Sequence, residues 1–409
     1  MVLAQISASL ATPLLSGSAD PNEVDVDYPI RPSEVKGIWR WWARSLVAGA
    51  LFNRGLLNGE SNKNAVKTPT KAEASVISEI VGIDMGLGYV GRGKKHRASC
   101  FSIEVETMDN VSPKIANNDY NIRDLNRVKL LTLGKRQVEY LDQLRIRIIV
   151  DDHLNCGLSS DAVKASLGAL GLALNLSCLG KGGRRGLGCL DIQVEGNYSR
   201  LFNMEWRIGD AVNEAMNYVD KVVGNHVLER MAGSSGRSRC SLSPIPSVTI
   251  SDLTNCVDRN YRSNRDQKLF SFQVITMEAG KDKLQLLHNF FLRPERARAT
   301  RGDPRGKDDL RLRLMAWILG LPREQRGTGY EITSGSDRRA SPMLLAVHGK
   351  TSYLTVLTSA DWPRKLMWID GGNKPINISE NDIINATYTA LNEFTEYLNR
   401  RGIRWHSWP

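Results

Sequence analysis

The residues best suited to chemistry lie in a nine-residue segment, Gly180–Gly188, which holds five glycines and three cations. Glycine allows positive φ and lets another backbone come close. Successive exposed N–H groups can form an anion-binding concavity, and arginine adds a planar fork that matches phosphate oxygens. We therefore predict that this glycine loop lies against a polyanion, an ordinary glycine turn being the alternative. The residues predicted to contact the polyanion are Lys181, Gly182, Gly183, Arg184 and Arg185.

Two histidines could support acid–base chemistry. His153 follows Asp151 and Asp152 directly after a predicted strand, and a carboxylate beside an imidazole suits proton transfer. A polar strand end is the alternative. His96 lies in a basic segment and could act without metal, but it lacks an identifiable partner. The sequence has no HExxH motif and no zinc-type cysteine spacing, so we expect no metal and no other cofactor.

The elements around the glycine loop argue against a nucleotide site. Ser159 or Ser160 can cap a helix that runs to Leu179, and Gly180 follows its end. Beyond the loop, apolar and polar residues alternate over 190–195, which predicts a strand. The order is helix, loop, strand, whereas Walker and Rossmann loops run strand, loop, helix. A mononucleotide is therefore not the expected ligand.

A second cationic element precedes this region. We predict a helix capped by Ser33, with residues 36–52 as its body. At about 100° per residue, Lys36, Arg40 and Arg44 fall on one stripe with no acid to neutralise them. The predicted core stripe is Val35, Trp39, Trp42 and Leu46. Trp41 lies on neither stripe and could stack on a base, contact a partner protein or be buried.

Composition sets broad limits on the class of protein. The chain has 409 residues, for which two domains are the default, and a net charge of +11 that favours a polyanionic partner. Neither a signal peptide nor an apolar run long enough to span a membrane occurs. The six cysteines form no CxxC pair, so we expect reduced, mostly buried thiols in a cytoplasmic protein.

The element order predicts an α+β fold made of two ferredoxin-like, or RRM-like, domains with insertions, at 1–200 and 201–409. The first half predicts β-α-β-β-α-β over residues 2–196, with 107–142 as an insertion. A helix over 208–229 would join the halves. The second half predicts a strand at 270–276, a helix at 308–319, strands at 342–348 and 352–358, and a helix at 381–399. Its last strand is expected to be missing or reduced to residues 403–405.

Three short motifs resemble the RAMP superfamily of CRISPR proteins. The first runs from Arg31 to Trp42 and follows the segment Thr12–Gly17, the second is the glycine loop, and the third spans 335–344. The residues matching these motifs are Arg31, Ser33, Lys36, Gly37 and Arg40; Gly182, Gly183, Arg184, Arg185, Gly186 and Gly188; and Arg338, Arg339, Ser341 and Pro342.

Within the superfamily, the tryptophan-rich first helix and the chain length are most similar to the first-subunit family of the type III-B Cmr effector complex. The resemblance implies a non-catalytic RNA-binding subunit that contacts the 3′ part of the CRISPR RNA. It also implies help in capturing target RNA for antiviral defence. The implied partners are CRISPR RNA, target RNA and other Cmr subunits, with no membrane and no small-molecule substrate.

Two further basic clusters favour RNA. The first contains Arg92, Lys94, Lys95 and Arg97, and the second contains Arg296, Arg298 and Arg301. Such contacts give salt-dependent binding with little sequence preference, although solvated loops are the alternative. Two other functions stay open for the whole chain. One is a RAMP endoribonuclease that processes repeat RNA, and the other is an assembly subunit whose basic faces meet acidic subunits.

Overall fold

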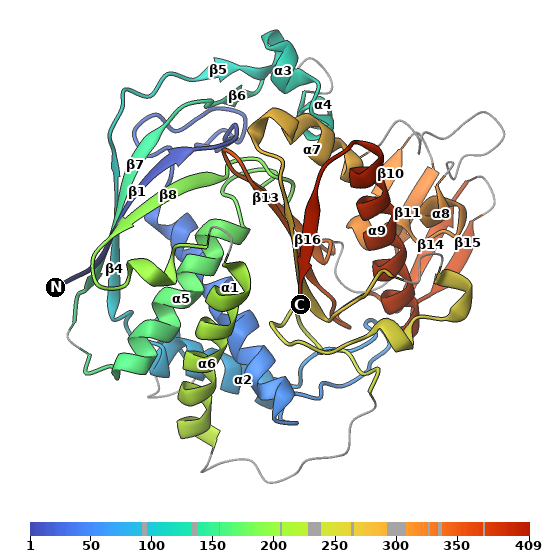
Figure 1. Ribbon diagram of the computed structural model, residues 1–409, viewed down its shortest axis with the longest axis horizontal. Helices are drawn as coiled ribbons and strands as arrows, with labels where there is room; N and C mark the ends of the chain where they lie inside the picture. The colour runs from blue at the N-terminus through green and yellow to red at the C-terminus, as the bar shows by residue number, and fades with distance from the viewer. Residues whose placement is uncertain are drawn as a thin grey trace.

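The computed structural model describes residues 1–91, 96–132, 137–154, 156–204, 207–227, 239–262, 266–292, 308–321, 323–325, 328–333, 338–370 and 373–409. From one side to the other, the chain forms a sheet, a helical layer, a second sheet and a further helix (Figure 1). A separate smaller sheet lies beyond this stack. The structure is mixed α and β, as the sequence predicts.

The first sheet contains β1 (Val2–Leu10), β4 (Phe101–Thr107), β7 (Arg145–Asp152) and β8 (Leu190–Glu195). Its order is β4-β7-β1-β8, and neighbouring strands are antiparallel. Ile6 is opposite Ile148 and Val194, which puts apolar residues on the helix side, whereas Ser7 faces outward and is exposed. With the helices below, the β-α-β-β-α-β order predicted for this half is the observed one.

The helical layer contains α1 (Pro32–Asn53), α5 (Ser160–Leu176) and α6 (Ile208–Val227). The predicted cap of α1 is wrong: Arg31 is the cap residue, and Pro32 occupies the first helical turn. Proline suits that position because its missing N–H would be unbonded there in any case. Ser159 caps α5 as one of the two predicted residues, accepting the Ala162 N–H at 3.1 Å.

Helix α5 ends three residues earlier than predicted. Its last residue is Leu176, and the chain then extends so that the Leu179 N–H donates to the Gly188 carbonyl at 2.9 Å. This hydrogen bond closes the base of the glycine loop. The helix is therefore shorter than predicted because the Leu179 N–H bonds to the loop and not to a carbonyl of α5. Sequence periodicity does not show this hydrogen bond.

The second sheet contains β9 (Phe272–Met277), β12 (Met343–Val347), β13 (Ser352–Leu357) and β16 (Trp405–Trp408). Its order is β12-β13-β9-β16, with antiparallel neighbours. The final strand, expected to be missing or reduced to 403–405, is present at 405–408 as β16 and pairs with β9. The first helix of this half is α7 (Leu284–Leu292), not the predicted 308–319 segment. That segment forms the short α8 (Asp309–Leu312) and a 3-10 turn over Ala316–Leu319.

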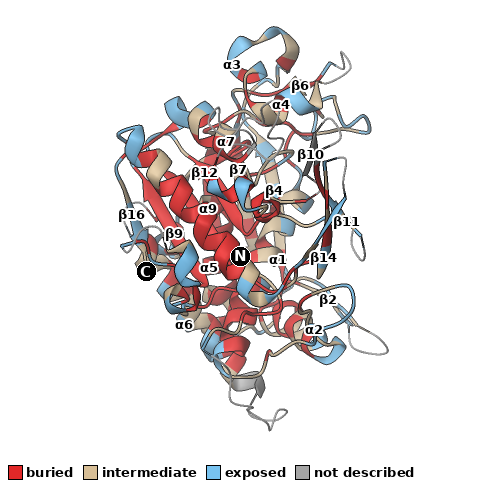
Figure 2. Cartoon of the chain, turned by 90° about the vertical axis from the view of Figure 1, so that its right-hand side faces the viewer, coloured by how far each residue is buried: buried red, intermediate tan, exposed pale blue. Residues whose placement is uncertain are grey.

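The second sheet is buried on both faces. Phe272 and Val274 belong to the apolar cluster around α1 and α5, whereas Ile275 and Met277 belong to the cluster around α9 (Glu380–Arg400). Figure 2 shows α5 and α9 as mostly buried helices. The two clusters therefore do not divide at residue 200, and the domain boundary there stays a prediction.

The remaining described elements form insertions. The first half adds α2 (Lys71–Glu79), β2 (Tyr89–Val90), β3 (His96–Arg97), β5 (Lys114–Ile115), α3 (Tyr120–Arg123), α4 (Asn126–Leu131) and β6 (Glu139–Tyr140). The second half adds a sheet of β10 (Arg323–Gln325), β11 (Thr328–Ile332), β14 (Lys365–Ile369) and β15 (Lys374–Asn377). The sequence analysis did not predict this third sheet. Within the described ranges, no helix is long and apolar enough to cross a membrane.

The six cysteines form three disulfides: Cys100–Cys156, Cys178–Cys189 and Cys240–Cys256. The expectation of reduced thiols is therefore wrong for this structure. The paired cysteines are 56, 11 and 16 residues apart, spacings that match no known motif, so the sequence gave no sign of these pairs. The second disulfide has a local consequence, because it closes the glycine loop at its base.

Candidate nucleic-acid interface

Helix α1 presents the predicted cationic stripe opposite its buried stripe. The side chains of Val35, Trp39, Trp42 and Leu46 are buried, as predicted. Arg44 is exposed, and Lys36 and Arg40 are partly buried. Burial and the neighbouring Arg40 charge lower the pKa of Lys36, and burial and Arg44 lower that of Arg40. No carboxylate within the described ranges pairs with Lys36 or Arg44.

Arg40 also forms hydrogen bonds with the backbone of a neighbouring turn. Its Nε donates to the Leu87 carbonyl at 2.9 Å and its Nη2 to the Gly88 carbonyl at 2.9 Å. These bonds fix the turn after α2 beside α1. Gly37, one turn earlier, is exposed, and an added Cβ would meet nothing within 4 Å. The close backbone approach that could explain a glycine here is not made by the described chain.

Trp41 joins the stripe to the glycine loop. It is partly buried, its ring lies edge-on to Trp42, and the Arg184 guanidinium lies 5.2 Å from its ring centroid. A cation at this distance from an indole is attracted by the ring quadrupole. The first and second sequence motifs are therefore in contact in the folded chain.

The glycines of the loop pack against this chain's own backbone. An added Cβ would lie 2.4 Å from the Cys178 carbonyl oxygen at Gly183 and 2.2 Å from the Leu179 carbonyl oxygen at Gly188. Gly182 has φ +84°, and its nearest neighbour is Leu187. These glycines therefore give the loop its shape, and the direct polyanion contacts assigned to Gly182 and Gly183 stay a prediction.

Arg185 points into the protein, away from the cationic stripe. Its guanidinium donates to the carbonyls of Leu319 and Met343 and lies 4.6 Å from the ring centroid of Phe291. Burial, then Arg184 and Arg127, lower its pKa to about 9, so it is still charged at neutral pH. These bonds join the loop to the second half, so a polyanion contact by Arg185, which stays a prediction, would compete with them.

The third motif comes to the same place. Burial and the Arg339 charge lower the pKa of Arg184. The Arg184 carbonyl accepts the Leu345 N–H of β12 at 3.2 Å, which holds the loop against the strand that this motif enters. Arg339 is partly neutralised: its Nη2 contacts an Asp361 carboxylate oxygen at 2.7 Å, and its guanidinium stacks on Trp362 at 4.7 Å. Arg338 is exposed. The structure thus brings α1, the glycine loop and the third motif together.

Two predicted contacts have partners elsewhere in the chain. Arg31 forms a 2.8 Å ion pair with Asp25 and donates to the Gly17 carbonyl at 3.3 Å. Arg97 donates to the carbonyls of Ile83 and Cys156 at 3.1 and 2.9 Å. Both guanidiniums stabilise loops, so an RNA contact by either would compete with those bonds. The other members of the two basic clusters, Arg92, Lys94, Lys95, Arg296, Arg298 and Arg301, lie outside the described residues.

The sequence analysis missed two residues at this junction. Arg127 of α4 lies in the 107–142 insertion, and its charge lowers the pKa of both Lys181 and Arg185. His288 of α7 is buried, and its ring contacts both Arg185 and Arg127. Neither belongs to a motif, so only a prediction that the insertion folds back onto the loop could have found them.

The acid–base candidates lie apart from this junction. Asp151 pairs with Val2 at one end of β1, whereas Leu10 at the other end pairs with Leu190 beside the glycine loop. His153 follows Asp151 at the far end, where its N–H donates to the Cys100 carbonyl. Among the described residues, no group of histidine, cysteine and carboxylate side chains is arranged to hold a metal ion.

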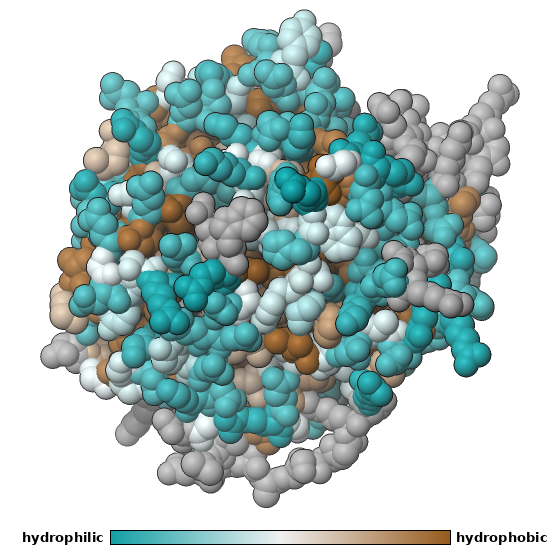
Figure 3. All heavy atoms as spheres, in the orientation of Figure 1, coloured by the Kyte–Doolittle hydropathy of each residue, from teal (hydrophilic) through white to brown (hydrophobic). Residues whose placement is uncertain are grey.

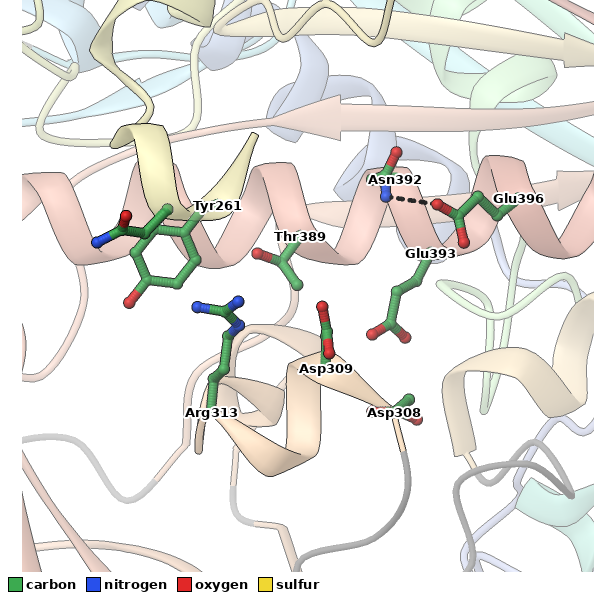
Figure 4. A pocket seen from close by; sticks show the side chains of 9 residues that line it. Tyr261, Asp308, Asp309, Arg313, Thr389, Asn392, Glu393 and Glu396 are labelled. Atoms are coloured by element: carbon green, nitrogen blue, oxygen red, sulfur yellow. Dashed lines mark hydrogen bonds between the residues drawn. The ribbon is translucent and has the colours of Figure 1, made fainter. Parts of the chain in front are cut away.

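One pocket lies between α8 and α9, with a volume of about 290 Å³ (Figure 4). Its lining includes the carboxylates of Asp308, Asp309, Glu393 and Glu396 together with the guanidinium of Arg313. This balance of charge does not suit a phosphate. The molecular face in Figure 3 is mostly hydrophilic, with apolar residues scattered among polar ones. The cationic junction is therefore the candidate interface.

An α+β chain with a β-α-β-β-α-β unit and a glycine loop before its last strand defines a class of protein, and the comparison with known families names it. Residues 8–191 match the model of the RAMP superfamily, so this half, which holds the first two motifs, is a RAMP domain. The predicted resemblance to this superfamily is therefore confirmed for residues 8–191. No curated protein sequence matches it.

Two solved structures resemble the chain over nearly its full length. Cmr1 from Pyrococcus furiosus, in its apo crystal form, is 16% identical, with 99% of this chain and 98% of that chain covered and a TM-score of 0.49. A chain of the type III-B Cmr-beta complex, bound to cognate target RNA and AMPPnP in the presence of ssDNA, is 11% identical. There, 96% of this chain and 99% of that chain are covered, with a TM-score of 0.52. The second likeness shows a shared fold.

Proposed function

We propose that this protein is a non-catalytic RNA-binding subunit of a type III-B CRISPR effector. In that role it contacts the 3′ part of the CRISPR RNA and helps to capture target RNA in the cytoplasm. We also propose that both halves are ferredoxin-like RAMP domains, because each has the strand order 4-1-3-2 of such units. The fold shared with a chain of an RNA-bound Cmr complex supports this assignment.

One observation carries the proposal: three cationic segments, far apart in sequence, converge where the two halves meet. The pKa values of Lys36, Arg40, Lys181 and Arg184 are all lowered, with burial as the first cause. Cations held together in this way lower the stability of the free protein and bind an anion more strongly. A phosphate backbone supplies such anions in a row.

The arrangement suits recognition of RNA without regard to its sequence. Lysine and arginine contacts to phosphates position a nucleic acid, whereas base contacts specify it. Trp41 adds a ring on which a base can stack, a contact that tolerates any base. An effector subunit that handles guides of many sequences needs binding of this kind. Catalysis is not part of the proposal, since His153 lies at the opposite end of β1 from the loop.

The test is the salt dependence of binding to a single-stranded RNA by the full chain. Each phosphate contact to a single strand adds about −0.7 to the slope of log K against log salt. The double variant Lys36→Gln with Arg44→Gln should make the slope less negative by about 1.4. Fluorescence anisotropy over a salt series measures this slope.

The matched control is Arg145→Gln with Arg147→Gln, which removes the same charge from the outer face of the first sheet. There the two arginines already pair with Asp109 and Glu106. An equal loss of slope in both double variants would show only a net-charge effect and would overturn the interface. In the assembled complex, an absence of RNA crosslinks to α1, the glycine loop and the Arg338 segment would favour the assembly alternative.

A further inference from the structure

The insertion helix α4 is fastened directly to the glycine loop. The Nε2 of His288 accepts the Arg127 N–H at 3.1 Å, so its Nδ1 carries the proton and donates to the Arg185 carbonyl at 2.8 Å. One imidazole therefore joins the two segments. Beside it, Asn289 accepts the Asn126 N–H at 3.0 Å. These bonds fix the start of α4, and with it the origin of the Arg127 side chain.

The same bonds leave the Arg127 guanidinium beside other cations. The side chain is partly buried, and within the described parts of the chain it donates no hydrogen bond and pairs with no carboxylate. Burial and the Arg338 charge lower its pKa. Lys181 has its pKa lowered by burial and by Arg127, even though Asp20 opposes the effect. Lys181 and Arg338, on two other segments, thus both lie within range of the Arg127 charge.

Backbone contacts bring the Arg338 segment to this place. Leu321 and Arg339 exchange backbone hydrogen bonds of 2.7 and 3.3 Å, and the Leu319 carbonyl accepts from the Arg185 guanidinium. The segment before β12 is therefore held beside the loop by its main chain as well as by charge. These bonds fix the backbone from which the cations project, which reduces the ordering that binding of an anion would require.

We propose that Arg127, Lys181 and Arg338 together bind one phosphate group of an RNA backbone. The 107–142 insertion then forms a third wall of the interface, besides α1 and the glycine loop. An arginine fork matches two phosphate oxygens, and a lysine ammonium adds a point charge. This inference rests on the proposed function and adds to it a contact that lies in none of the three RAMP motifs.

The experiment repeats the RNA titration with Arg127→Gln in the full chain. The variant keeps the backbone N–H that donates to His288, so the fastening of α4 is preserved. The salt slope should become less negative by about 0.7. If the two proteins bind equally well at 1 M salt, the variant should therefore bind about fivefold more weakly than wild type at 0.1 M salt. Arg127→Lys, which keeps the charge, should retain the wild-type slope.

The matched control is Lys129→Gln on the same helix. Lys129 is exposed and already pairs with Asp124 at 3.2 Å. Two residues along a helix point to nearly opposite faces, so this change should leave the slope unaltered. If Arg127→Gln binds RNA like wild type while the Lys36 and Arg44 double variant does not, the phosphate site is overturned and the proposed function stands.

A second measurement separates the two proposals if wild-type protein fails to bind RNA. That failure would overturn the proposed function, and it would also show that RNA is not the ligand of the site formed by Arg127, Lys181 and Arg338. Thermal unfolding with inorganic pyrophosphate then tests the site itself, because a ligand of the folded state raises the unfolding midpoint. A rise in wild type that Arg127→Gln loses supports an anion site. Equal rises in both proteins overturn it.

Discussion

At the residue scale, His288 keeps the interior side of the glycine loop free of an additional charge. Its ring is buried between Arg185 and Arg127, accepting a hydrogen bond at Nε2 and donating one at Nδ1. Only the neutral ring can do both. A proton on Nε2 would remove the acceptor and place a third cation beside two arginines. Burial and these two charges accordingly lower the pKa of His288 to about 4.

This lowered pKa predicts how stability depends on pH. In the unfolded chain a histidine has a pKa of about 6.5, so below that value the unfolded state binds a proton that the folded state does not. The stability contributed by neutral His288 is complete above pH 6.5 and is lost as pH falls toward 4. The loss should be roughly 3 kcal/mol at most, since one pKa unit equals about 1.4 kcal/mol.

Urea unfolding from pH 7 to pH 4.5 measures that loss. The variant His288→Gln is neutral throughout and retains one donor and one acceptor, so its free energy of unfolding should change less with pH than that of wild type. Parallel pH profiles for the two proteins would show that other groups cause the acid sensitivity.

At the element scale, the glycine loop is a rigid connector. Hydrogen bonds from the N–H groups of Lys181 and Gly188 to the carbonyls of Leu15 and Pro13, both at 2.8 Å, hold it against the segment before α1. On its other side, the Leu345 N–H of β12 donates to the Arg184 carbonyl at 3.2 Å. The disulfide at its base joins the two chain ends of the loop. Its backbone is therefore bonded on every side described, and only some of its cations remain available to a ligand.

Two glycine substitutions should have opposite effects on stability. At Gly188, φ is +74° and an added Cβ would lie 2.2 Å from the Leu179 carbonyl oxygen, so Gly188→Ala should lower the free energy of unfolding by at least about 2 kcal/mol. At Gly37 an added Cβ meets open space on a helix, so Gly37→Ala should raise it by about 0.5–1 kcal/mol.

Chemical denaturation of the two variants and wild type tests the pair. If Gly188→Ala has the same free energy of unfolding as wild type, the loop rearranges around the new side chain and is more deformable than its hydrogen bonds suggest.

At the scale of the whole molecule, the second sheet belongs to both halves. Trp42 of α1 lies edge-on to Phe272 of β9 at 6.4 Å between ring centroids, and Phe272 lies 6.1 Å from Trp408. A helix of the first half is therefore packed on the sheet of the second. Shared burial of this kind couples the folding of the halves.

The variant Phe272→Ala tests this coupling. Removing a buried phenylalanine should lower stability by about 3–5 kcal/mol. Because the side chain serves both halves, calorimetry should show one transition that moves as a whole. Val90→Ala, at a side chain that is 95% exposed, is the control and should change little. Two transitions, with only one displaced, would instead support independent domains at 1–200 and 201–409.

The parts that sequence could predict are those with local signals. Alternation marked β1 and β8, and helical periodicity marked α1, α5 and α9. The glycine loop and the stripe through Lys36 were visible for the same reason. Segments whose structure depends on distant partners were not visible. β16 forms because it pairs with β9, α7 because it packs beneath the loop, and Arg127 joins the interface only through His288.

The loop's two sides have a thermodynamic consequence. One side bonds to β12 and joins the halves, while the partly exposed Lys181 and Arg184 belong to the proposed RNA interface. A ligand can bind more tightly when the two halves are in contact at the loop. Because coupling free energy is reciprocal, that ligand then stabilises the contact between the halves by the same free energy. RNA and the contact between the halves would then act as mutual effectors, so that a protein without RNA opens more readily at this seam than one that holds it.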